Sequence, residues 1–246
     1  SYGTWWSDGE RMDAADTFVV KKTQLFQLSL HWLIVCFHAL SFVFQLIPVL
    51  MKATYMEWVD EGRNPLRFVE YAASASIMLV CIALLNAVED VNELGAIFAL
   101  CVLTQILGLL AEDLHAKKPS QKSLVASLHF LGWFSITAAY GLIWVHFGVA
   151  LQNAAPGRTP PDFVYAIVIL LYLLFNMFGA VQLLQVYSLE TLRCGACCRW
   201  CTSIESKHLS EVWFTFLSLF AKTLLGWMLY ANVVVMGKAG CEQMYH

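Results

Sequence analysis

The stretch that decides the fold is LSEVWFTFLSLFAKTLLGWMLYANVVVM, residues 209–236, an apolar run long enough to cross a bilayer as a helix. Lys222 lies near its middle, about 13 residues from either end, on the order of 20 Å at 1.5 Å per residue. A lysine side chain cannot reach water over that distance, and a charged lysine at mid-bilayer costs about 2.5–3.5 kcal/mol. Lys222 is therefore expected to face the interior of a helical bundle.

Five further apolar runs precede this one, separated by short polar loops. The 246-residue chain is 59% hydrophobic and only 13% charged, which is outside the usual range of a soluble domain. We therefore expect an all-α membrane protein, with residues 1–23 as an external loop segment and residues 24–246 as one transmembrane bundle. The predicted spans are residues 24–50, 66–88, 93–113, 123–150, 162–187 and 209–236.

The orientation of the chain follows from its lysine and arginine residues, which gather in cytoplasmic loops of membrane proteins. They are concentrated in alternate loops: Lys52 and Arg63, then Lys117, Lys118 and Lys122, then Arg193, Arg199 and Lys207. We expect these loops to be cytoplasmic, with the amino end of the chain and the C-terminus both outside.

A second buried charge is expected in RNPLRFVEYAASASIMLV, residues 63–80. Pro65 suits the first turn of a helix, where no backbone donor is needed. Glu70 follows more than one turn later, and Ser74 is four residues further on, where its hydroxyl can hydrogen-bond the carboxylate. The lysine run has a matching face of small and polar residues near a 3.6-residue spacing: Thr215, Ser218, Lys222 and Gly226.

A buried lysine and a buried glutamate leave two interpretations open. In the first, the two form an ion pair that fixes the register of their helices. In the second, the lysine forms an imine with a carbonyl ligand, because desolvation favours the neutral, nucleophilic amine. The protonated imine would then need a nearby anion, which Glu70 would supply.

Three segments resemble the heliorhodopsins, a family of retinal proteins distinct from the ion-pumping microbial rhodopsins. RFVEYAASASIM, residues 67–78, resembles the family's counterion helix, with its pattern arginine–x–x–glutamate–tyrosine–small–small–serine. SLFAKTLLGW, residues 218–227, is similar to its retinal-lysine helix. FVYAIVILLYLLFN, residues 163–176, is similar to its fifth-to-sixth helix region.

The resemblance implies a seven-helix rhodopsin-like bundle that lies inverted in the membrane. It implies that Lys222 carries all-trans retinal as a protonated Schiff base and that Glu70 is the counterion. It also implies roles for Ser218 near the Schiff base and for Ser74 near the counterion.

The family has seven spans where this sequence shows six, so its first helix is expected to be missing here. TQLFQLSLHWLIVCF, residues 23–37, looks like the family's second helix. Either the chain is trimmed, or the first helix was cut and is held non-covalently. His31 and His38 share one face of the run 24–50, and two alternatives stay open for each. Each histidine either accepts a Schiff-base proton or is a capped interior histidine.

A retinal pocket needs a long apolar slot with aromatic walls. Gly108 would leave space for the chromophore, and Met78 lies on the Glu70 face. The candidate pocket residues are Tyr71, Met78, Gly108, Trp133, Tyr140, Phe175, Phe178 and Trp227. Aromatic residues in membrane bundles also serve in packing and in interfacial belts, which is the alternative for each of them.

The expected function is light sensing by a retinal protein that is not an enzyme, since phosphate loops, HExxH and nucleophile elbows are absent. Its expected partners are the bilayer, retinal, a second copy in a homodimer and an unidentified signalling partner. Nucleic acid is not expected, because no span carries a basic face.

Two other functions remain as alternatives. Light-gated proton or ion transport could use Glu211 and Glu190 as a path from Glu70 and Lys222 to the cytoplasm. A transporter without retinal could instead use Lys222 and Glu70 as an ion-pair switch. Visible absorption would distinguish this transporter from the two retinal proteins, because only a retinal protein would absorb visible light.

Two further groups of residues lie at the predicted cytoplasmic face. Glu112 and Asp113 are expected to end a helix there, in contact with solvent. The cluster C-x-x-C-C-x-x-C has zinc-like spacing, but its position at a membrane end, among basic residues, also suits palmitoylation, and a third alternative is no special role. Its residues are Cys194, Cys197, Cys198 and Cys201, and no metal site is predicted.

Overall fold

The computed structural model describes residues 2–4, 10–12, 17–19, 23–26, 28–152, 162–187 and 206–231. Its helices are α1 (Leu30–Leu50), α2 (Lys52–Asp60), α3 (Pro65–Leu85), α4 (Val91–Lys117), α5 (Lys122–Gln152), α6 (Asp162–Tyr187) and α7 (Ser206–Leu229). Its strands are β1 (Tyr2–Thr4), β2 (Glu10–Met12), β3 (Thr17–Val19) and β4 (Thr23–Phe26), paired antiparallel as β1 with β4 and β2 with β3.

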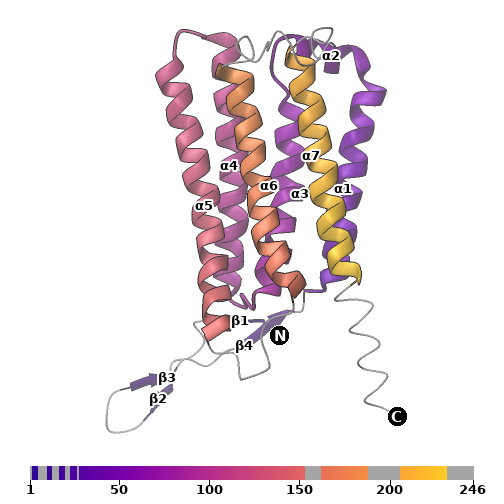
Figure 1. The fold of residues 1–246 in the computed structure, drawn as a ribbon. Coiled ribbons are helices and arrows are strands. Elements are labelled where there is room, and N and C mark those ends of the chain that lie inside the picture. Colours follow the sequence, from indigo (N-terminus) through magenta and orange to yellow (C-terminus); the bar gives the residue numbers. More distant parts are fainter. Residues whose placement is uncertain are drawn as a thin grey trace.

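Six of the helices, all except α2, are long and apolar enough to cross a membrane. The predicted all-α membrane bundle with six spans is therefore confirmed, and the chain is an integral, multi-pass membrane protein. The four short strands lie at one end of the bundle and α2 lies at the opposite end (Figure 1).

The spans differ from the predicted ones mainly at their ends. The first was expected to begin at residue 24, but β4 pairs there with β1, and α1 begins only at Leu30. Strand pairing satisfies the backbone groups that a helical turn would otherwise satisfy. Helix α3 ends at Leu85, before the left-handed backbone of Ala87 at φ 59°. Residues 232–236 of the predicted last span lie outside the described residues.

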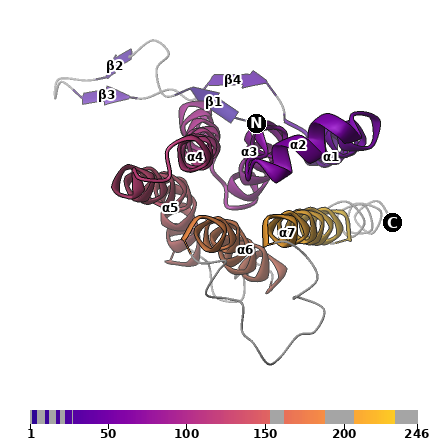
Figure 2. The same cartoon turned by 90° about the horizontal axis from the view of Figure 1, so that it is seen from above.

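The spans form a ring, in the order α1, α3, α4, α5, α6, α7, with α7 returning to α1 (Figure 2). Helix α3 is the most buried of them. The Asn64 side chain caps its first turn by accepting a hydrogen bond from the Arg67 backbone N at 3.2 Å, and Pro65 occupies the first helical position. This start fixes which α3 residues point into the ring.

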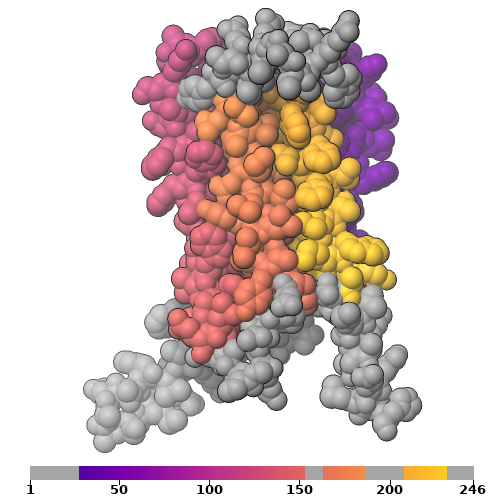
Figure 3. All heavy atoms as spheres, viewed as in Figure 1, coloured from indigo at the N-terminus to yellow at the C-terminus, as the bar shows by residue number. Residues whose placement is uncertain are grey.

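The outward face of the bundle is apolar, as a lipid-facing surface should be. Helices α6 and α7 lie side by side on the face seen in Figure 3. Their exposed large apolar residues include Ile169, Leu173, Met177, Trp213, Phe216, Leu219 and Trp227. The hydrocarbon of a bilayer would cover this surface without a hydration cost.

Candidate functional site

A buried ion pair joins α3 to α7 inside the ring. The Lys222 Nζ donates a hydrogen bond to the Glu70 Oε1 at 2.6 Å. Lys222 is 6% exposed and Glu70 is 4% exposed, so the expected interior position of both charges is observed. Removing one partner of such a pair would leave the other charge buried and uncompensated, at a cost of about 3–5 kcal/mol.

Tyr71 packs against one side of this pair and also connects the same two helices. Its ring centroid is 5.2 Å from the Lys222 Nζ, and its hydroxyl donates to the Phe214 backbone oxygen at 3.1 Å. Ser218 of α7 lines the same cavity as Tyr71 and Lys222. A change in the ion pair would therefore directly affect the contact between Tyr71 of α3 and Phe214 of α7.

Ser74 does not form the expected hydrogen bond to Glu70. The Ser74 hydroxyl is buried and has no hydrogen-bond partner in the part of the chain that the structure describes. The Glu70 Oε1 is instead engaged across the ring with Lys222.

The two candidate histidines do not contact the ion pair among the described residues. His31 is exposed and hydrogen-bonds the Ser29 hydroxyl at 3.1 Å. The His38 Nδ1 instead hydrogen-bonds the Ile34 backbone oxygen at 2.9 Å, and its ring lies against Gly226, one turn beyond Lys222 on α7. Of the two, only His38 packs on the lysine helix.

An apolar cavity begins at Lys222 and extends between α3, α4, α5 and α6. Six of the eight candidate pocket residues line it: Tyr71, Met78, Gly108, Trp133, Phe175 and Phe178. The sequence reasoning did not select several other lining residues, among them Phe68, Gln105, Ile136, Gly179, Gln182 and Phe214. These depend on how the helices rotate against one another, which the periodicity of a single span does not specify.

The other two pocket candidates do not line this cavity. Tyr140 is fully buried but lies behind the cavity wall, where its ring meets Phe175 edge-on at 5.8 Å between centroids. Trp227 is 69% exposed on the outside of the bundle. At about 100° per residue, the five positions from Lys222 to Trp227 turn the helix by about 140°, away from the cavity.

The cavity suits a slender apolar group with a carbonyl end, because the Lys222 side chain lines it together with aromatic rings. Two glycines keep it open. A Cβ added at Gly108 would lie 2.7 Å from the Phe68 Cε1 and 3.3 Å from the Gln182 Oε1. A Cβ at Gly179 would collide with the Trp133 indole. These residues suit retinal.

Replacing Gly108 with valine should therefore lower the yield of pigment severalfold after addition of retinal, since the side chain must displace Phe68 or fill the cavity. Visible absorbance per mole of folded protein measures the effect. Gly141→Ala is the matched control, because a Cβ there meets nothing within 4 Å. Equal pigment yield in both variants would show that the Gly108 region does not bound the site.

Glu112 is a site residue that the sequence reasoning missed. It was expected to contact solvent at a helix end, but it is 1% exposed and pairs with Arg67 of α3. Glu211, a candidate for a proton path, also pairs with Arg67. Arg67, the first residue of the RFVEY segment, was the available signal, because a buried arginine requires carboxylate partners. Glu190 and the four-cysteine cluster lie outside the described residues.

A multi-pass helical bundle whose buried lysine lines an aromatic cavity and pairs with a buried carboxylate has the architecture of a rhodopsin-type retinal protein. The family model for heliorhodopsin matches residues 7–234, and the chain belongs to the heliorhodopsin family. This membership makes it a retinal-binding membrane protein of the rhodopsin type. A comparison with curated proteins found no match.

Proposed function

We propose that this chain is a light sensor that carries all-trans retinal on the Lys222 amine, with Glu70 as the counterion. The observation that carries the proposal is the 2.6 Å contact between the Lys222 Nζ and the Glu70 Oε1 beside the aromatic cavity. Bound retinal supplies light absorption and isomerisation. The chain supplies the attachment point, a fixed anion and an enclosure.

Glu70 stabilises positive charge at the Lys222 nitrogen, because burial removes the water that would otherwise screen the two groups. The Tyr71 ring lies on one side of the pair. Its hydrogen bond to the Phe214 backbone links the pair to both α3 and α7. A proton that moves between the nitrogen and Glu70 changes the charge beside that link, which gives the bundle a way to exchange one packing for another.

The two halves of the bundle support sensing over conduction. On the side of Lys222 away from α2, Ser76 is buried on α3, but the core contributed by α3 and α7 is otherwise built from apolar residues such as Leu79, Ile82, Ala83, Leu225 and Leu229. A small polar cavity runs toward α2 and is lined by both Glu70 and Glu211. If polar access exists on one side of the bundle alone, a proton can leave the Lys222–Glu70 pair and return to it from the same side. A sensor needs no more than this.

The proposed orientation places the α2 end in the cytoplasm. The lysines and arginines at the helix ends on that side include Lys52, Arg63, Lys117, Lys118 and Lys122. The opposite end carries Glu89, Asp90 and Glu93 in its α3–α4 region. The positive-inside tendency therefore supports an outside amino end.

Whole-cell voltage clamp under illumination tests sensing against transport. We expect no steady photocurrent at any voltage or proton gradient, because the core residues Leu225 and Leu229 beyond Lys222 are apolar, and the His38 imidazole that packs against Gly226 hydrogen-bonds the Ile34 backbone oxygen rather than a further polar group toward the far end of α7 among the described residues. Cells that express Lys222→Ala serve as the unpigmented control. Photocurrents that reverse with the proton gradient and vanish in Glu70→Gln would replace the sensor with a light-gated proton conductor.

A further inference from the structure

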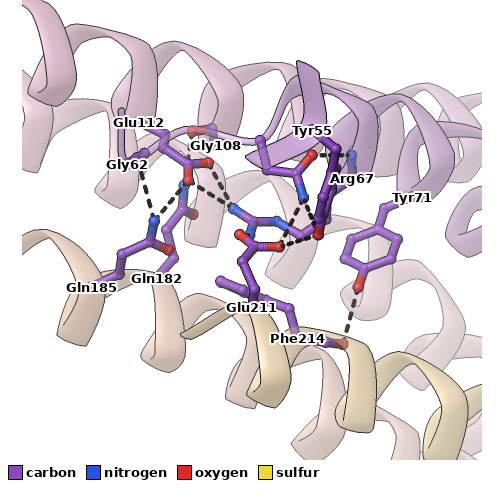
Figure 4. Close-up of polar contacts among 11 residues, drawn as sticks. Tyr55, Gly62, Arg67, Tyr71, Gly108, Glu112, Gln182, Gln185, Glu211 and Phe214 are labelled. Atoms are coloured by element: carbon purple, nitrogen blue, oxygen red, sulfur yellow. Dashed lines mark hydrogen bonds and ion pairs between the residues drawn. The ribbon is translucent and has the colours of Figure 1, made fainter. Parts of the chain in front are cut away.

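A second buried charge cluster joins α3, α4 and α7 at the α2 end of the bundle, and Figure 4 shows its contacts. The Arg67 Nη2 donates to both carboxylate oxygens of Glu112, at 2.9 and 2.7 Å. The Arg67 Nη1 donates to the Glu211 Oε1. The two carboxyl groups therefore bind neighbouring nitrogens of one guanidinium.

The side chains of this cluster are largely buried. The side chains of Arg67, Glu112 and Glu211 are 4%, 1% and 13% exposed. The guanidinium lies over the Phe214 ring at 3.8 Å and near the Phe68 ring at 4.8 Å from the centroid. With aromatic rings against the guanidinium, solvent cannot screen the charges as it would at a surface.

The charges in the cluster do not balance when all three groups are ionised. Two carboxylates face one guanidinium, which leaves a net charge of −1 in a buried site. An uncompensated buried charge is costly, and two carboxylates that share a site favour uptake of a proton by one of them.

Neutral donors complete the cluster without changing its charge. The Asn64 Nδ2 donates to the Glu211 Oε2 at 2.8 Å, and the Gln185 Nε2 donates to the Glu112 Oε1 at 2.8 Å. The Tyr55 hydroxyl donates to the Glu211 Oε2 at 3.3 Å. Burial, followed by the nearby Glu211 charge, raises the pKa of Tyr55 to about 12, so it remains neutral at physiological pH.

The other charged groups near the cluster have partners of their own. Arg63 contacts Glu61 and Asp113, and Lys117 also contacts Asp113, on the solvent side. His208 of α7 shares a groove with Glu211 but contacts Asp60 at 3.2 Å. The Lys222–Glu70 pair, on the other side, balances itself. In the described part of the chain, no cation other than Arg67 forms an ion pair with Glu112 or Glu211.

We propose that the Arg67–Glu112–Glu211 cluster is a second proton-binding site, which holds one exchangeable proton shared between its two carboxyl groups. A metal ion is a poorer occupant, because the described residues contain no group of three or more His, Cys, Asp or Glu side chains able to bind one. The polar cavity between Glu70 and Glu211 gives this proton a route to and from the ion pair at Lys222.

Infrared spectroscopy of the protein without retinal tests the site independently of light sensing. At neutral pH we expect a carboxylic-acid C=O band that shifts on transfer to heavy water and weakens as the pH is raised. Glu112→Gln and Glu211→Gln should each abolish it, because either change leaves one carboxylate opposite Arg67 and a balanced charge. Asp113→Asn, at the neighbouring partly exposed position, should leave the band intact, and so should Glu70→Gln and His208→Gln.

Two results would overturn the proposal: a wild-type protein with no protonated carboxyl group at neutral pH, or a band that survives in both Glu112→Gln and Glu211→Gln. If a variant does not fold, isotope-labelled glutamate in the wild type decides the question. The band must then shift with the label and keep its full intensity in labelled Glu70→Gln. An unshifted band would assign the proton to another residue type.

Discussion

Lys222→Ala is expected to abolish the pigment completely when the protein is reconstituted with retinal. Lys222 is the sole lysine or arginine deep within a predicted span, and its amine lines the cavity that suits retinal. Loss of the visible absorption band measures the effect. Lys118→Ala, at an exposed position, is the matched control and should form pigment at the wild-type level.

The alanine variant also leaves Glu70 without its partner, so failure to fold must be separated from failure to bind retinal. Lys222→Met combined with Glu70→Gln removes both charges and avoids the uncompensated carboxylate. This double variant should fold, as shown by a monodisperse elution profile and helical circular dichroism, and should remain colourless. A coloured form of either variant would refute Lys222 as the attachment site.

Glu70→Gln is expected to change both the colour and the pH titration of the pigment. Glu70 supplies the negative charge at 2.6 Å from the Lys222 nitrogen, so its loss destabilises the cationic form of that nitrogen. The deprotonated, ultraviolet-absorbing form should then appear at a lower pH than in the wild type. The expected displacement is about 1–3 pH units, the usual effect of an opposite charge at close range.

Spectrophotometric titration measures this displacement, and Glu112→Gln is an informative control. Glu112 belongs to the Arg67 cluster and does not contact Lys222 among the described interactions, so its replacement should move the titration much less. If the Glu70→Gln spectrum and titration match the wild type, another group acts as the counterion.

Hydropathy was sufficient to predict the six spans, because a bilayer requires about 20 apolar residues per helix whatever the tertiary contacts are. It was not sufficient for the start of α1. Residues 24–26 belong to an apolar-rich run, yet they pair as part of β4 with β1, and hydropathy does not report strand pairing.

The Lys222–Glu70 contact could be predicted because a charge inside an apolar span must face the interior of the bundle and pair with an opposite charge there. The Arg67–Glu112 contact could not, since Glu112 comes near the end of its span, where a solvated position was equally consistent with the pattern. Trp227 shows the limit of motif similarity. It lies in the matched lysine segment, but the helical turn directs it to the outside of the bundle.

The central claim is that Lys222 is the covalent attachment site of retinal, and the most direct measurement locates that bond. Borohydride reduction of the illuminated pigment converts the linkage to a stable amine, and proteolysis with mass spectrometry then identifies the modified peptide. We predict that the retinyl mass is found on the peptide that contains Lys222 and on no other lysine. Retinyl on a different residue, or a coloured protein with no covalent adduct at Lys222, would contradict the account.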